Sequence, residues 1–449
     1  MIRHVAIVGA GFSGTLQAIN LLRHGGPRAT LIERAPRPGL GLAYGAAHPS
    51  HVLNVRASNM SAFPDEPDHF VRWLETRGVP DAPAAFVPRL TYGIYLRELL
   101  DEAQARAGDR LRIVQGDALD VVENGDVRVQ LANGPEIVAD AAVLAVGNLP
   151  PHSPPGLDPA AISAERYKGD PWEPGVGEGL SGEDTVLVIG TGLTMVDVVL
   201  MLDARGFKGH IVALSRRGLL PRRHEAPAAW EKIVEKPSES GAKLVHRVRE
   251  RAQEVGWRNA VDELRPYTQA LWAQATEADR ARFLRHLRPW WDVHRHRLAP
   301  VVADRLADLQ ASGRLNVVAG KTLGFEEVSN GVNVRYRPRG DEVEQRLHVH
   351  RIINCTGPQG DLLRTSEPLL RRLVDRGAVR PDPEHLGLDV TISGQVVRAD
   401  GSASERLFAL GPMTRGAFWE IVAVPDIRRQ TWDVARRLSN AHWVGGEGL

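Results

Sequence analysis

The chain contains a single cysteine, Cys355, among its 449 residues. One thiol cannot form an intramolecular disulfide, and it excludes both a redox-active cysteine pair and a metal site built from several thiolates. Long apolar runs are also missing, because no stretch approaches the roughly 20 residues of a membrane-spanning helix. The first apolar stretch, residues 5–8, is too short for the core of a signal peptide. We therefore expect a cytoplasmic protein that is not a disulfide reductase.

An excess of one charge is absent as well, since 56 Lys and Arg residues face 55 Asp and Glu residues. Such a chain has no global field to recruit nucleic acid or an anionic membrane, so neither is an expected partner. The histidines, His224 included, show no metal-ligand spacing with nearby carboxylates, and no Gly-x-Ser-x-Gly motif occurs. We predict no metal site. A chain of 449 residues is too long for one hydrophobic core, which indicates at least two domains.

What the sequence does contain is a dinucleotide-binding pattern close to its start. An apolar strand at residues 5–8 is followed by Gly9, Gly11 and Gly14 and then by a helical pattern. In this pattern the first glycine permits a tight turn, the second lets a pyrophosphate approach the backbone, and the third lets helix and strand pack closely. Glu33 ends the next strand, where a carboxylate accepts hydrogen bonds from ribose hydroxyls. The pattern predicts an FAD site.

A second copy of the pattern begins with Gly190 and Gly192, and Met195 stands in place of its third glycine. Because that glycine serves helix packing, its loss does not remove the anion site. The strand that follows ends in Arg216 and Arg217, and guanidiniums at this point suit the 2′-phosphate of NADPH. The alternatives are an empty, degenerate second site and ordinary surface charge at the two arginines.

The elements after the two glycine loops also repeat, as residues 110–116 (RLRIVQG) and 314–320 (RLNVVAG) show. We infer an internal duplication of a nucleotide-binding architecture. The expected fold is α/β, with an FAD-binding Rossmann-like domain interrupted by an NAD(P)H-binding one. The expected boundaries are 1–155 and 350–449 for the first domain and 156–349 for the second, including a mainly helical insertion at about 222–312.

The whole chain resembles the YdhS-type FAD/NAD(P)-binding proteins, which are relatives of the two-dinucleotide flavoprotein monooxygenases. The motifs that carry the resemblance are residues 9–14, Leu53-Asn54-Val55 with Met60, residues 190–197 and residues 291–297. It implies that Leu53, Asn54 and Gly411 approach the flavin, and that the strand-end glycines Gly147 and Gly357 lie between the domains. Residues 167–172 lack the histidine of the Baeyer–Villiger motif, which counts against ester-forming oxygen insertion.

The pattern and the resemblance together give a set of expected cofactor contacts. For FAD they are Gly9, Gly11, Phe12, Ser13, Gly14, Glu33, Arg34, Leu53, Asn54, Met60, Ala118, Gly147, Gly411 and Ile421. For NADPH they are Gly190, Gly192, Leu193, Thr194, Ser215, Arg216, Arg217 and Gly357. No catalytic residue is identified by a motif, and the candidates are His294, Arg297 and Asn54.

Two interpretations of the segment 290–297 (WWDVHRHR) are open. It is either an aromatic and cationic wall for an anionic substrate or for the nicotinamide, or a self-paired helix start with its tryptophans packed inward.

These observations predict an FAD-dependent, NADPH-consuming monooxygenase that uses O2 to hydroxylate a small, nitrogenous or anionic substrate through an oxygenated flavin. One alternative is an FAD-dependent NAD(P)H dehydrogenase or reductase without oxygen insertion. Another is a dinucleotide-binding regulatory protein. The sequence leaves open the substrate and whether the protein forms a homo-oligomer.

Overall fold

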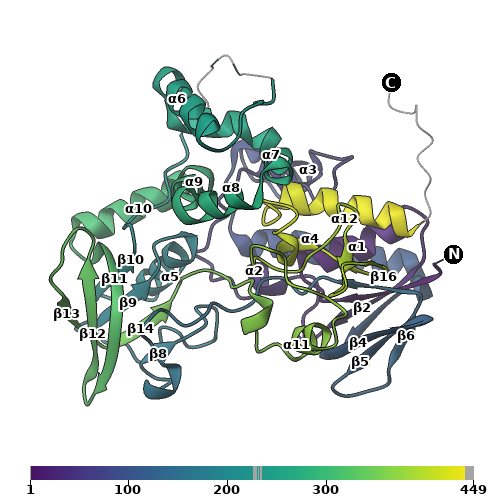
Figure 1. The fold of residues 1–449 in the computed structure, drawn as a ribbon, viewed down its shortest axis with the longest axis horizontal. Helices are drawn as coiled ribbons and strands as arrows, with labels where there is room; N and C mark the ends of the chain where they lie inside the picture. The colour runs from purple at the N-terminus through teal and green to yellow at the C-terminus, as the bar shows by residue number, and fades with distance from the viewer. Residues whose placement is uncertain (1, 226–229, 231, 233–234, 440–449) are drawn as a thin grey trace.

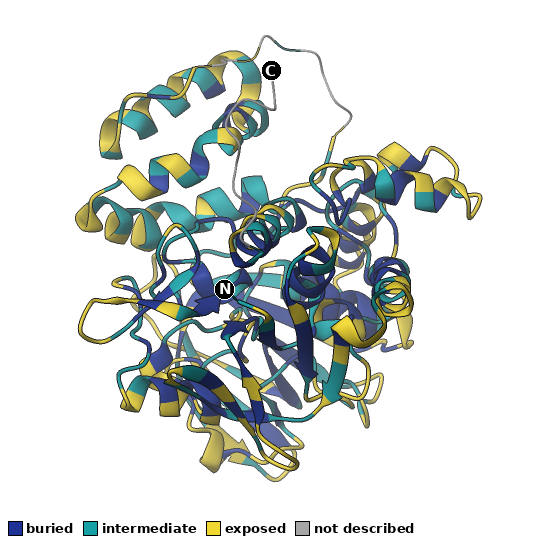
Figure 2. Cartoon of the chain, turned by 90° about the vertical axis from the view of Figure 1, so that its right-hand side faces the viewer, coloured by how far each residue is buried: buried dark blue, intermediate teal, exposed yellow. Residues whose placement is uncertain are grey.

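The computed structural model describes residues 2–225, 230, 232 and 235–439 (Figure 1). The two glycine patterns belong to two separate sheets, because each pattern begins directly after a strand of one of them. A group of helices lies over the sheets. Buried residues concentrate in the strands and on the inner faces of the helices (Figure 2). None of the helices in the described ranges is long and apolar enough to cross a bilayer.

The first sheet has the strand order β15-β16-β7-β1-β2-β3, and all its strands except β15 run parallel. Its strands are β1 (His4–Val8), β2 (Arg28–Glu33), β3 (Leu111–Gln115), β7 (Ala141–Leu144), β15 (Gln395–Val397) and β16 (Ala403–Ala409). β1 lies inside the sheet and is buried on both faces, which explains its continuous apolar sequence.

Helices cover one face of this sheet, where α1 (Phe12–Arg23) packs against α4 (Arg89–Ala107) and α12 (Val424–Leu438). A small antiparallel sheet covers the other face and consists of β4 (Ala118–Asn124), β5 (Asp126–Leu131) and β6 (Ile137–Ala139). Alternate residues of β1 serve the two layers: Val5 and Ile7 join the core under the helices, and Ala6 and Val8 join the core under β4–β6. Short helices lie in the connections: α2 (Gly41–Gly45), α3 (His69–Glu75) and α11 (Pro368–Asp375).

The second sheet has the order β13-β12-β11-β10-β9-β14-β8. Its strands are β8 (Tyr167–Lys168), β9 (Thr185–Ile189), β10 (His210–Ser215), β11 (Leu315–Val328), β12 (Gly331–Pro338), β13 (Gln345–Val349) and β14 (Arg351–Asn354). β11 pairs parallel with β10 and then antiparallel with β12, so the hairpin extends the sheet. α5 (Leu193–Ala204) and α10 (Pro300–Ala311) share its buried core.

A group of helices stands between β10 and β11. Its helices before α10 are α6 (Gly241–Leu264), α7 (Thr268–Gln274), α8 (Glu277–Arg282) and α9 (Arg288–Arg295). Figure 1 shows them at the top of the molecule, reaching from the second sheet toward α12.

The expected α/β class with two Rossmann-like sheets is confirmed. The return to the first sheet differs from the expected position at residue 350. β14 pairs with β9, with Ile352 opposite Leu187, and its residues are fully buried. Because β14 lies inside the second sheet, between β9 and β8, the chain returns to the first half only after Asn354.

Candidate functional site

The first glycine loop has the close packing that only glycine allows. A Cβ at Gly9 would lie 2.4 Å from the carbonyl oxygen of Ala145, and the φ of Gly9 is +98°. A Cβ at Gly14 would lie 1.8 Å from the carbonyl oxygen of Gly9, so α1 packs directly on the loop. Gly11 precedes α1 and no side chain caps the helix, which leaves its first N–H groups available to an anion.

Glu33 and Gly411 complete this end of the first half. The Glu33 carboxylate accepts hydrogen bonds from the backbone N–H groups of Ala10 at 2.7 Å and Ala35 at 2.9 Å, which fixes it beside the loop. A Cβ at Gly411 would lie 2.4 Å from Ser13 Oγ. The structure therefore brings together two expected FAD positions, Ser13 and Gly411, from opposite ends of the sequence.

Other expected FAD positions have mixed surroundings. The Phe12 ring packs against Tyr44 and Tyr92, and Ala118 is buried in the core under β4. The backbone at Gly147 has a φ of +70° and open space where a Cβ would be. Arg34 is half exposed and forms an ion pair with Glu367 at 2.9 Å, so its guanidinium is directed toward the C-terminal half.

The second glycine loop repeats this geometry at Gly190, where a Cβ would lie 2.1 Å from the carbonyl oxygen of Cys355. Gly192 precedes α5 without a side-chain cap and has open space around it, as does Gly357 with its φ of +95°. Met195, at the third glycine position, is fully buried in the core of the second half. Helix packing at this position therefore uses a large side chain instead of a close backbone approach.

Arg216, Arg217 and Lys321 form a cationic patch at the end of β10. Ser215 Oγ accepts a hydrogen bond from the backbone N–H of Gly218 and lies 2.8 Å from Thr191 Oγ1, which orders the turn. Arg216 is exposed, and the Arg217 guanidinium lies 6.0 Å from the centre of the Trp290 ring. Lys321, on the neighbouring strand β11, faces the same cavity. No local sequence pattern marks Lys321, because the pairing of β11 with β10 brings it to this place.

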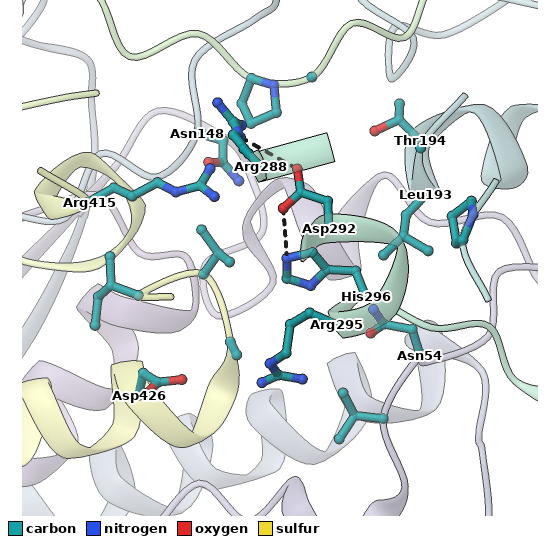
Figure 3. A pocket seen from close by; sticks show the side chains of 18 of the residues that line it. Asn54, Asn148, Leu193, Thr194, Arg288, Asp292, Arg295, His296, Arg415 and Asp426 are labelled. Carbon is teal, nitrogen blue, oxygen red and sulfur yellow. Dashed lines mark ion pairs between the residues drawn. The ribbon is translucent and has the colours of Figure 1, made fainter. Parts of the chain in front are cut away.

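One cavity of about 2010 Å³ connects the two halves of the molecule. Expected positions on its wall are Leu53, Asn54, Met60, Ile421, Gly190, Gly192, Leu193, Thr194, Ser215, Arg216, Arg217 and Gly357. The remaining expected FAD positions, at Gly9–Gly14, Glu33, Arg34, Ala118, Gly147 and Gly411, lie outside that wall. The helical insertion closes the cavity with residues of α9, several of which Figure 3 labels.

Polar contacts also join the two halves beside the cavity. Arg89 forms a 2.8 Å ion pair with the buried Asp197, and His51 Nε2 donates a hydrogen bond to the Asp197 carbonyl oxygen at 3.0 Å. Burial raises the pKa of Asp197 to about 6. His224 Nε2 donates to the carbonyl oxygen of Asn54 at 2.9 Å, and burial lowers the pKa of His224 to about 4. Sequence reasoning did not find these contacts.

The 290–297 segment agrees in part with both interpretations, because one of its tryptophans is packed inward and the other is exposed. Trp291 Nε1 donates to Glu420 at 2.7 Å and Arg295 Nε donates to the same carboxylate at 2.9 Å, so these side chains anchor α9 to the first half. Trp290 instead remains 43% exposed. The anchoring partner, Glu420, is itself buried and has a φ of +73°, which is rare for a residue with a side chain.

The three candidate catalytic residues occupy different surroundings. Arg297 lies on the cavity wall, but it is buried and makes a bidentate pair with Asp262, at 2.8 Å and 2.9 Å, which suits a structural role. His294 stacks on Trp257 away from the cavity wall. Asn54 lies on the wall, together with Arg295 and His296 (Figure 3).

A charged group on α9 faces the cavity in place of His294. Asp292 pairs with Arg288 at 3.4 Å and lies 3.7 Å from His296 Nε2. Burial lowers the pKa of His296, which favours its neutral form. Arg415 approaches from the segment after β16 and lines the same wall as Asn148 (Figure 3).

Comparison with known proteins gives three findings. Residues 6–149 match the model of a family described as FAD-NAD(P)-binding. No curated protein gives a significant match. Similar solved structures cover nearly the whole chain.

Two of these structures are described as monooxygenases and a third as a hydroxylase. L-lysine 6-monooxygenase from Pseudomonas syringae is 16% identical with a TM-score of 0.69, covering 98% of this chain and 100% of its own. The desferrioxamine-pathway cadaverine monooxygenase from Erwinia amylovora is 14% identical with a TM-score of 0.68, covering 98% and 95%. Ornithine hydroxylase from Pseudomonas aeruginosa is 15% identical with a TM-score of 0.66, covering 98% and 99%. At these identities the likeness establishes a shared fold along the whole chain.

Proposed function

We propose that this protein is an FAD-dependent, NADPH-consuming monooxygenase that hydroxylates a small, nitrogenous or anionic substrate. The observation that carries the proposal is the cavity of about 2010 Å³ bounded by both halves. Met60 and Ile421 line it from the first half, and Gly192 and Thr194 line it from the second. A nicotinamide held by one half and a flavin held by the other require such a common space for hydride transfer.

The residues of the first half fit FAD. The uncapped start of α1 offers backbone N–H groups to a pyrophosphate, and Glu33 offers a carboxylate to ribose hydroxyls. FAD bound here would supply hydride acceptance and the activation of O2, while the chain orients the reactants and excludes water. We assign FAD to the unit that contains β1 and α12.

The residues of the second half fit NADPH. Gly192 leaves open space at the start of α5, which suits a pyrophosphate against the helix N-terminus. Arg216, Arg217 and Lys321 provide cations near the end of β10, where the 2′-phosphate of NADPH would bind. We assign NADPH to the unit that contains β9 and α5.

A nitrogenous substrate is supported by the descriptions of proteins with the same fold, which name lysine, ornithine and cadaverine. O2 is the proposed co-substrate. The buried Cys355 has no cysteine partner in the sequence, so this chain cannot pass electrons to a disulfide through a dithiol.

The test is a simultaneous measurement of NADPH oxidation, O2 uptake and hydrogen peroxide release during a screen of amines and carboxylic acids. A monooxygenase consumes NADPH and O2 in equal amounts and releases a hydroxylated product. NADPH oxidation coupled to a reduced organic product without O2 uptake would support the dehydrogenase alternative. A protein that stays colourless after reconstitution with FAD would contradict both.

A further inference from the structure

Closely spaced charges lie on and behind the cavity wall between α9 and residues 411–426, and most of them are paired. Asp292 pairs with Arg288 at 3.4 Å, and Glu420 pairs with Arg295 at 2.9 Å. Asp426 pairs with Arg265. Each of these carboxylates therefore already has a guanidinium partner.

Arg415 is the exception in this group. Among the described residues, no acidic side chain lies within 4.0 Å of its guanidinium, and its Nε is buried without a hydrogen-bond partner. Burial and the nearby charge of Arg288 lower the pKa of Arg415 to about 10, so the group is still charged at neutral pH. Arg415 is partly buried, and a cation largely removed from water without a carboxylate partner is costly, so an anion that enters the cavity would offset part of that cost.

Arg415 is also held in a fixed position. Its guanidinium lies 4.3 Å from the centre of the Trp419 ring, and Trp419 stacks on Trp272 at 4.7 Å. Trp272 Nε1 in turn donates to the carbonyl oxygen of Gly416 at 2.7 Å, which ties the insertion to this segment. A guanidinium held against aromatic rings keeps its planar fork of donors available to a ligand.

Two further donors lie on the same wall. Figure 3 shows the side chains of Arg288, Arg415 and Asn148 in one region of the cavity. Asn148 is exposed to the cavity, and its amide can donate to an anion. The planar, two-oxygen shape of a carboxylate matches a guanidinium fork.

We propose that Arg415, with Arg288 and Asn148, forms a subsite that binds a carboxylate group of the substrate. This inference rests on the proposed function, because it places the substrate in the cavity shared by the two cofactor sites. A phosphate is a poorer candidate here, because the cations proposed for the 2′-phosphate, Arg216 and Arg217 after β10 and Lys321 within β11, lie elsewhere, and the pyrophosphates are assigned to the helix starts. The substrate class is therefore a small carboxylic acid.

The test uses the FAD-loaded full-length protein. Binding of succinate and of 1,4-diaminobutane, which has the same chain length without carboxylates, is measured by calorimetry and by flavin difference absorbance. We expect succinate to bind and the diamine not to bind. Arg415→Met is expected to weaken succinate binding about 10- to 100-fold, the loss expected for a charge-assisted bidentate pair.

Two variants control the experiment. Arg282→Gln removes a charge from α8, where Arg282 is 76% exposed and off the cavity wall, and it should leave succinate affinity unchanged. Arg415→Lys keeps the charge without the fork and should bind succinate with intermediate affinity. This conservative variant also serves if Arg415→Met does not fold.

Equal succinate affinity in the wild-type protein and in both Arg415 variants overturns the proposal, as does a wild-type protein that binds no succinate at millimolar concentration. A change in FAD content or flavin spectrum without a change in succinate affinity also overturns it, because the guanidinium would then serve the flavin. A colourless protein whose succinate binding still depends on Arg415 would remove the proposed function and leave the subsite intact.

Discussion

Arg89 and Asp197 form a 2.8 Å ion pair that joins the two halves of the molecule, with 16% and 8% of their side chains exposed. His51 belongs to the same junction. Its Nε2 donates to the Asp197 carbonyl oxygen, and its Nδ1 accepts from the backbone N–H of His48 at 3.0 Å. These two partners require a neutral imidazole, because a protonated Nδ1 could not accept that hydrogen bond.

His51 predicts an acid-sensitive contribution to the stability of this junction, while the raised pKa of Asp197 acts in the opposite direction as the pH falls through 6. Burial lowers the pKa of His51 from 6.5 to about 4, so the unfolded chain binds a proton that the folded chain rejects within that window. His51 contributes on the order of 3 kcal/mol to the free energy of unfolding. This contribution is fully present above pH 6.5 and is lost as the pH falls toward 4. His51→Gln should lessen the dependence of the urea midpoint on pH between 4 and 6.5, whereas an unchanged slope would contradict the assignment. His246→Gln is the matched control, because His246 is exposed and its replacement should leave this pH dependence unchanged.

Replacing both Arg216 and Arg217 by Ala should raise the KM for NADPH about 10- to 100-fold and change the KM for NADH little, because only NADPH carries the 2′-phosphate. Steady-state NAD(P)H oxidation measures both constants. Arg205→Ala removes an exposed arginine that lies off the cavity wall and should change neither. Equal losses for the two nucleotides would show that the phosphate is not bound at the end of β10.

Glu33→Arg should yield protein without FAD, because a guanidinium replaces the acceptor for the ribose hydroxyls and repels the positive end of α1. Absorbance near 450 nm and the FAD released on denaturation measure this outcome. Glu102→Arg, at a 60% exposed position of α4, should stay yellow and controls for the charge change. A Glu33→Arg protein that keeps its full flavin content would refute the assignment of the first site.

Met195→Gly would restore the third glycine of the second pattern, yet we expect it to destabilise the protein. Met195 is fully buried, so truncation leaves a cavity in the core of the second half and adds a glycine to α5. The expected loss is about 3–5 kcal/mol in the free energy of unfolding. Denaturant unfolding checks it. Met195→Leu preserves most of the volume and should cost less than about 1.5 kcal/mol.

The sequence predicted much of the fold because the decisive signals are local. The apolar strand expected at residues 5–8 is part of β1 (His4–Val8), and the helical pattern expected after the first glycines is α1 (Phe12–Arg23). The spacing of the glycines alone predicted the roles of Gly9 and Gly190. The structure shows the reason for glycine there, because the backbone of the neighbouring strand-end segment leaves no room for a Cβ. Apolar periodicity and glycine spacing are readable within a few tens of residues.

The parts that the sequence did not reveal depend on contacts between distant segments. Glu420 carries no motif, and its role appears only when Trp291 and Arg295 lie against it. Lys321 and Arg415 likewise acquire a role from the strands and rings around them. Single side chains brought together by tertiary structure leave no periodic pattern in a lone sequence.

The placement of β16 beside β7 affects how the protein is made on the ribosome. β7 (Ala141–Leu144) is complete early, but its second parallel neighbour consists of residues 403–409. During synthesis, the inner strand β7 therefore exposes a bare row of backbone donors and acceptors until nearly the whole chain has emerged. A nascent chain halted before that point would be prone to aggregate through this unpaired strand edge.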